Sequence, residues 1–123
     1  MQYVLVFFGG GIGAALRHGV NMAAARLGLA FPLGTLAVNV VGSFLMGVLV
    51  AWFALRGGVD QHLRLLLTTG LLGGFTTFSA FSLDAALLWQ RGALAQLMLY
   101  AGGSVLLGVA GLFAGMAAVR LLA

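Results

Sequence analysis

The sequence predicts an all-α membrane protein with four transmembrane helices. Of its 123 residues, 63% are hydrophobic and 7% are charged, which leaves too little polar surface to cover a soluble domain of this length. The apolar residues also fall into long runs, and a helix crosses lipid because it satisfies its own backbone hydrogen bonds. We therefore expect a single transmembrane domain over residues 1–123, with spans at about 3–25, 33–55, 63–90 and 93–121.

The first span is the least regular. Tyr3 to Leu16 supplies 14 apolar residues before Arg17 and His18, whereas the bilayer core takes about 20 in a helix. This segment crosses only if Arg17 lies at membrane depth, where an arginine usually faces a water-filled cavity or the bundle interior and marks a functional path. Alternatively, Arg17 reaches up to the headgroups or ends a tilted helix. The residues alone leave both interpretations open.

The second span, Leu33 to Leu55, is uncharged and follows a turn that holds the only proline. Its polar and small residues recur every four positions, as Thr35, Asn39, Ser43 and Gly47. Residues at this spacing share one face of a helix. A single asparagine or serine in a membrane helix more often holds neighbouring helices together than binds a ligand.

The third span is expected to break near its middle. Gly73 and Gly74, followed by Thr76 and Thr77, are poor helix formers at that depth. Non-helical backbone is tolerated inside a membrane only when it is buried in protein or lines a cavity. A break would free carbonyl oxygens, which suit hard cations, and amide groups, which attract anions. An ordinary kink relieved by the threonine hydroxyls is the alternative.

Three phenylalanines, Phe75, Phe78 and Phe81, follow the glycines at spacings of three. Phe78 and Phe81 share a face once the helix resumes, and Ser79 and Ser82 lie between them in sequence. Phenyl rings that face lipid would be ordinary. A ring edge is electropositive, however, so rings presented edge-on can stabilise an anion without trapping it.

The fourth span, Ala93 to Val119, carries a second polar stripe of Gln96, Tyr100, Ser104 and Gly108. Taken one by one, these residues are well explained as contacts between helices. Because the chain has so little other polarity, the two stripes taken together support an ion pathway as well as they support contacts between helices.

Charge is scarce and nearly balanced between the two sides of the membrane. With four spans, Arg56, Arg64 and Arg120 lie on the side of the N-terminus. Arg26 and Arg91 lie on the other side, joined by Arg17 if that residue is counted. Positive charge near span ends sets orientation, so this balance predicts insertion in both directions. We therefore expect an antiparallel, dual-topology homodimer with a two-fold axis in the membrane plane.

Glycine and serine pairs four residues apart predict close helix packing. The pairs are Gly9 with Gly13, Ser43 with Gly47, Gly70 with Gly74, and Gly111 with Gly115. Small residues at this spacing let two backbones approach each other inside a membrane.

Several classes of function are disfavoured. The six arginines are scattered and form no cluster that could follow phosphates, so no nucleic-acid partner is expected. The chain has no cysteine, and its two histidines and two aspartates are spread too widely for a recognisable enzyme site. We expect no enzymatic activity.

Three motifs follow one another along the chain. They are Gly9-Gly-Gly-Ile-Gly-Ala-Ala-Leu-Arg17, Gly34-Thr-Leu-Ala-Val-Asn39 continuing to Gly47, and Gly73-Gly-Phe-Thr-Thr-Phe-Ser-Ala-Phe-Ser82. Together they resemble the motifs of the Fluc (CrcB-type) family of bacterial fluoride channels. The match covers essentially the whole chain in the family's order and spacing. It implies a passive, fluoride-selective channel in the bacterial inner membrane that exports cytoplasmic fluoride and so reduces its toxicity.

The resemblance also implies roles for individual residues. The fluoride pathway it implies consists of Asn39, Phe78, Ser79, Phe81, Tyr100 and Ser104. Arg17 matches an arginine near the aqueous vestibule, which favours the functional interpretation of that residue. The backbone carbonyls of Gly73 and Thr76, from both subunits, match those that hold a central sodium ion.

The chain departs from the family pattern at four positions, His18, Ala80, Asp84 and Gly108, of which the last adds no hydroxyl to the fourth-span stripe. The main alternative function is a proton-coupled exporter resembling the small multidrug transporters, which are also antiparallel four-span dimers. That class needs a membrane-embedded carboxylate, and here Asp84 lies only toward the end of the third span. A structural or assembly subunit would leave the polar stripes and the glycine break unexplained.

Overall fold

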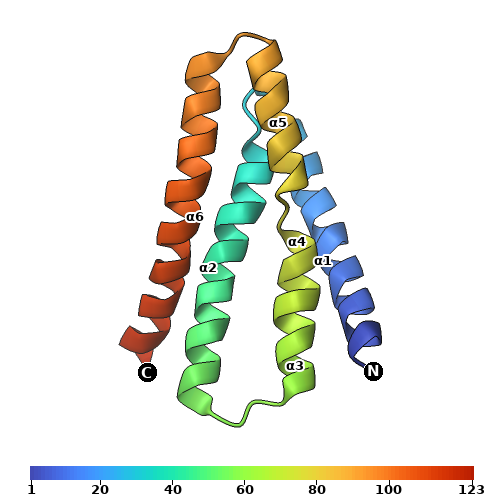
Figure 1. Ribbon diagram of the computed structural model, residues 1–123, viewed down its shortest axis with the longest axis vertical. Helices are drawn as coiled ribbons and strands as arrows, with labels where there is room; N and C mark the ends of the chain where they lie inside the picture. The colour runs from blue at the N-terminus through green and yellow to red at the C-terminus, as the bar shows by residue number, and fades with distance from the viewer.

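The computed structural model describes residues 1–123 and is helical throughout apart from short connections (Figure 1). In chain order the elements are α1 (Gln2–Ala25), α2 (Leu33–Arg56), α3 (Gln61–Leu65), the π-helix η1 (Leu66–Leu72), α4 (Gly73–Phe75), α5 (Ser79–Gln90) and α6 (Leu94–Leu122). Four helical segments are long and apolar enough to cross a membrane, namely α1, α2, the run Gln61–Gln90 and α6. The predicted four-span fold is confirmed.

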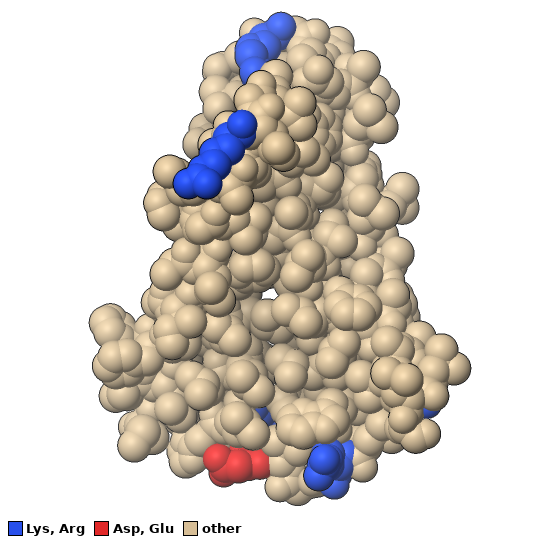
Figure 2. All heavy atoms as spheres, turned by 180° about the vertical axis from the view of Figure 1, so that it is seen from behind, with Lys and Arg blue, Asp and Glu red and all other residues tan.

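Both chain termini and the α2–α3 connection lie at one end of the bundle, and the other two connections lie at the opposite end (Figure 1). At that opposite end, Arg91 Nη2 donates to the carbonyl of Ala30 at 3.4 Å and ties the two connections together. Figure 2 shows the face opposite to that of Figure 1, with charged side chains toward its two ends and none across its middle. This uncharged middle zone matches the apolar core of a bilayer.

The first helix packs closely on the broken third helix through glycines. A Cβ atom added at Gly9 would lie 2.9 Å from the carbonyl oxygen of Leu66, and one added at Gly13 would lie 2.8 Å from the nitrogen of Phe75. Gly74 in turn approaches the backbone of Gly10 too closely for any side chain. The predicted small-residue packing is confirmed for this helix pair.

Helices α2 and α6 form the most extensive helix pair of the chain and run side by side in the same direction (Figure 1). A Cβ atom at Gly47 would collide with the carbonyl of Leu112, and one at Gly115 with the carbonyl of Phe44. This seam is therefore also built by small residues that let backbones meet.

The third span breaks where the sequence predicts, over Thr76–Phe78, although its two glycines are still helical. Thr76 has the extended conformation, with φ −88° and ψ 162°, and α5 resumes at Ser79. Gly73 and Gly74 stay helical as α4, where the missing side chain of Gly74 admits the backbone of α1. The π-helix η1 before them was not anticipated from the sequence.

Candidate functional site

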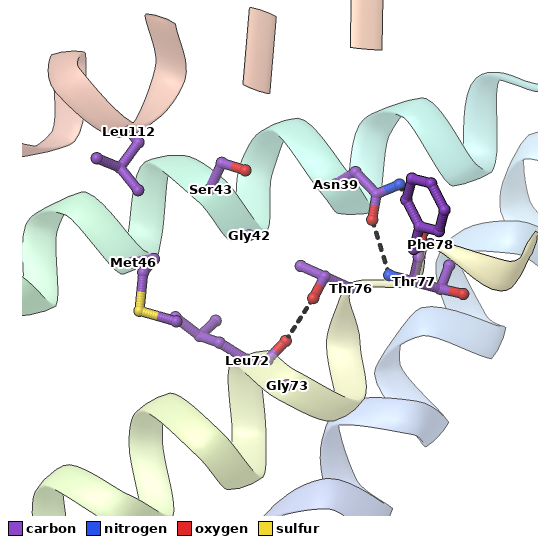
Figure 3. Close-up of a pocket in the computed structure, with 10 residues that line it drawn as sticks. All are labelled: Asn39, Gly42, Ser43, Met46, Leu72, Gly73, Thr76, Thr77, Phe78 and Leu112. Carbon is purple, nitrogen blue, oxygen red and sulfur yellow. Dashed lines mark hydrogen bonds between the residues drawn. The ribbon is translucent and has the colours of Figure 1, made fainter. Parts of the chain in front are cut away.

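Asn39 on α2 clamps the helix break (Figure 3). Its Nδ2 donates to the carbonyl of Thr77 at 2.9 Å, and its Oδ1 accepts from the Thr77 amide at 2.8 Å. A carboxamide is suited to this pairing because it offers a donor and an acceptor side by side, and one N–H is left over. The side chain thus replaces the helical partners that the break removes from Thr77, and it fixes where the break falls.

The helix that follows the break begins with hydroxyl contacts. Thr77 Oγ1 accepts from the amide of Ala80 at 3.1 Å and lies 3.3 Å from Ser79 Oγ. The Ser82 hydroxyl donates to the carbonyl of Phe78 at 3.0 Å. The N-terminus of α5 therefore lies in the middle of the third span, where its partial positive charge favours an anion.

The other side of the break presents carbonyl oxygens. No backbone amide of the chain donates to the carbonyls of Gly73 and Thr76. The Thr76 hydroxyl instead donates to the carbonyl of Leu72 at 3.0 Å, across one helical turn. Free carbonyl oxygens of this kind are ligands that hard cations prefer, so these two residues fit the predicted sodium contacts.

A cavity of about 320 Å³ opens between α2, α6 and the break (Figure 3). Its lining combines polar groups with apolar walls and consists of Asn39, Gly42, Ser43, Met46, Leu72, Gly73, Thr76, Thr77, Phe78 and Leu112. Two polar residues of the second-span stripe, Asn39 and Ser43, thus face the same space as the break.

Four aromatic rings follow one another beside the break. The Phe78 and Phe81 ring centroids are 5.6 Å apart, those of Phe81 and Tyr100 are 5.1 Å apart, and those of Tyr100 and Phe31 are 5.6 Å apart. Tyr100 is fully buried, whereas Phe78 is 79% exposed at the other end of the row. The structure therefore brings together three of the predicted pathway residues, and it adds Phe31, which sequence reasoning missed.

The buried Tyr100 hydroxyl donates to Asp84 Oδ2 at 2.9 Å. Asp84 also lines a cavity of about 330 Å³ between α1, α2 and α5, together with Asn21 and Thr35. Sequence reasoning treated Asp84 as a departure from the family pattern and as a poorly placed carboxylate for the alternative exporter. The available signal was that it is the sole acid within a span, but its partner on another helix could not be read from spacing.

Arg17 lines a different cavity from the one at the break. It lines a smaller cavity of about 240 Å³ with Ala14, His18 and Asn21, and its Nε is buried without a hydrogen-bond partner. Asn21 lines this cavity and the Asp84 cavity alike, so the arginine adjoins the polar space near the α1–α2 connection. A buried donor without a partner favours an anion or water at that place.

The remaining predicted residues lie along the seam between α2 and α6. Ser104 Oγ is buried without a partner. Thr35 lines the same cavity as Asp84, the partner of the Tyr100 hydroxyl. Ser43 Oγ is 3.7 Å from where a Cβ of Gly108 would be. The two polar stripes that the sequence places on separate helices therefore face each other across this seam.

Comparisons with known proteins agree with this architecture. The family described as "CrcB-like protein, Camphor Resistance (CrcB)" matches residues 4–116. A fluoride-specific ion channel FluC of Methylobacterium nodulans is 60% identical over 120 residues, which cover 98% of this chain and 97% of that protein. A protein of the same name from Rhodopseudomonas palustris strain BisB5 is 58% identical over 121 residues, covering 98% of each chain. The fluoride-specific ion channel FluC 2 of Nitrobacter hamburgensis is 57% identical with the same coverage.

Proposed function

Because the chain belongs to the family of CrcB-like proteins, we propose that it is a passive, fluoride-selective channel through which cytoplasmic fluoride leaves the cell. The observation that carries this proposal is the near full-length similarity to proteins named fluoride-specific ion channels. The geometry of the helix break and its surrounding donors supports it independently.

The arrangement suits a small, strongly hydrated anion. A pore that conducts fluoride must replace its water with hydrogen-bond donors and positive ring edges while staying too narrow for larger halides. Asn39 keeps one free N–H, Ser79 lies at the N-terminus of α5, and the Phe78–Phe81–Tyr100 rings stand beside them. None of these groups carries a full positive charge that would hold the anion in place.

The driving force requires no energy source in the protein. The neutral acid HF crosses lipid and ionises inside the cell, so fluoride accumulates when the outside is acidic. An inside-negative membrane potential favours exit of the anion by about 2.3 kcal/mol per charge for each 100 mV. We place the protein in the bacterial inner membrane, where such a potential exists.

The working unit that we propose is an antiparallel homodimer. In a single chain, the ring of Phe78 is 79% exposed beside non-helical backbone at Thr76–Phe78. Such backbone is not stable against lipid, and a second copy would cover it. The near-balance of arginines between the two ends supports insertion of copies in both directions.

We propose that a sodium ion at the dimer axis is coordinated by the free carbonyl oxygens at the helix break. The carbonyl oxygens of Gly73 and Thr76 have no donor within the chain, and two copies together would offer four oxygens to a hard cation. The ion would neutralise the clustered carbonyl dipoles and hold the two breaks together.

Purified protein in liposomes tests the function. Fluoride and chloride efflux is followed with ion-selective electrodes, with and without a proton gradient. Rapid fluoride loss without a proton gradient, and slow chloride loss, is expected for the channel. Efflux that appears only with a proton gradient would instead indicate an exporter and would refute the proposal.

Orientation is tested separately. The chain contains no cysteine, so a single cysteine introduced at Gln2 can be labelled with a membrane-impermeant reagent in intact cells. Labelling of about half the copies is expected, whereas a single orientation would rule out the antiparallel dimer.

A further inference from the structure

The register between α2 and α6 pairs the two polar stripes position by position. Ser43 lies beside Gly108, and one turn further on Gly47 meets the carbonyl of Leu112. The offset between partners is the same in both pairs, and it sets Thr35 level with Tyr100 because the two helices run in the same direction (Figure 1). The seam therefore sets the polar and small residues of the two stripes level with one another.

Where Ser43 and Gly108 meet, only α2 supplies a hydroxyl group to the seam. Gly108 has no side chain, and Ser43 Oγ lies 3.7 Å from the position that its Cβ would occupy. The Ser43 hydroxyl thus faces the space left by the missing side chain of Gly108 on α6. A glycine at this place provides space beside a donor rather than a donor of its own.

Two further observations bear on what the Ser43 hydroxyl could bind. Ser43 lines the cavity of about 320 Å³ that also contains Asn39 and the break residue Thr76 (Figure 3). One helical turn before Gly108, the hydroxyl of Ser104 is buried without a protein partner. Buried hydroxyls are nearly always hydrogen-bonded, so an orphan in a polar seam calls for a bound anion or water.

We propose that Ser43 is an additional fluoride-binding residue, whose hydroxyl supplies the donor at the level of Gly108. This inference rests on the proposed channel function and extends its pathway along the α2–α6 seam. The Ser43 hydroxyl donates to the anion from α2, and Gly108 leaves space for the anion on the opposite wall. Ser104 provides the preceding donor on α6.

The competing interpretation is that Ser43 only lets α2 and α6 approach, as small residues do in membranes. The two interpretations differ in one respect. A packing role needs a small side chain at position 43 and is met by alanine, whereas a binding role needs the oxygen atom and accepts it from either wall of the seam.

The experiment moves the hydroxyl across the seam. Ser43→Ala is compared with Ser43→Ala/Gly108→Ser and Ser43→Ala/Gly108→Ala by fluoride efflux from liposomes, alongside the unmodified protein. A side chain at 108 fits, because 3.7 Å is an ordinary van der Waals contact. Elution of each variant as a dimer checks assembly.

We expect Ser43→Ala to slow fluoride efflux by about tenfold, the effect of losing a hydrogen bond to a charged ligand. The variant with serine at 108 should recover most of that loss, and the variant with alanine should not. These two variants differ by one oxygen atom, so their comparison stands even if Ser43→Ala alone assembles poorly.

Equal efflux from the two double variants, or unchanged efflux from Ser43→Ala, would overturn the assignment of Ser43 while leaving the channel function intact. Absence of fluoride efflux from the unmodified protein would instead refute the channel function, and the assignment with it.

Discussion

Replacing Asn39 with aspartate is the sharpest test of the clamp at the helix break. The new side chain has nearly the same shape, and one of its oxygens can still accept from the Thr77 amide at 2.8 Å. Its second oxygen, however, takes the place of Nδ2 and faces the Thr77 carbonyl at 2.9 Å. One hydrogen bond is therefore lost and two acceptors are left opposed.

The size of the effect follows from these two contacts. A lost interhelical hydrogen bond costs roughly 1 kcal/mol in a membrane, and a buried polar group left unpaired adds about 1–3 kcal/mol. At about 1.4 kcal/mol per factor of ten, a total of about 2–4 kcal/mol lowers the population of molecules with an intact Asn39–Thr77 contact by roughly 30- to 700-fold. The negative charge of the aspartate also repels an approaching anion, which lowers fluoride efflux further.

Fluoride efflux from liposomes measures the outcome, and size-exclusion chromatography checks that the dimer survives. Gln90→Glu is the matched control, because it makes the same amide-to-acid change at the exposed last residue of α5. Efflux from Asn39→Asp within threefold of the unmodified protein would refute the reasoning, as would an equal loss in Gln90→Glu.

Three further changes test other parts of the site. Phe81→Ile removes the ring between Phe78 and Tyr100, so we expect fluoride efflux to fall by about tenfold with the dimer intact; an unchanged rate would remove Phe81 from the pathway. Tyr100→Phe takes the donor from the Asp84 carboxylate and should lower the free energy of unfolding by about 1–3 kcal/mol in detergent, and no change in the unfolding midpoint would contradict that contact's importance. Gly13→Ala should destabilise the fold by about 1–3 kcal/mol, because the added carbon would meet the backbone of the broken helix. Gly11→Ala is its control and should leave the stability unchanged, because a carbon added there meets nothing within 4 Å.

Local residue chemistry was enough to predict the break in the third span. Glycines and threonines at mid-span disfavour a regular helix whatever surrounds them, and the chain does leave the helix at Thr76–Phe78. The same reasoning could not separate Gly73 and Gly74, which stay helical, from the threonines. That distinction depends on α1, whose backbone at Gly10 contacts Gly74 and supports the helix there.

The partners of the polar side chains were likewise beyond sequence reasoning. Helical spacing placed Asn39 on a polar face, but it did not show that this face meets the Thr77 backbone, 38 residues away. The pairing of Tyr100 with Asp84 was missed for the same reason.

The sequence by itself determined that this protein is a bundle of four membrane-crossing helices, with a break in the third and polar stripes on the second and fourth. Hydrophobicity and the 3.6-residue period fix these features because they depend only on residues near one another in the chain. Only the tertiary structure showed that the stripes on the second and fourth spans face each other. Rotation and register between helices follow from how glycine surfaces interlock, as at Gly47 against Leu112, and such contacts join residues that are distant in sequence.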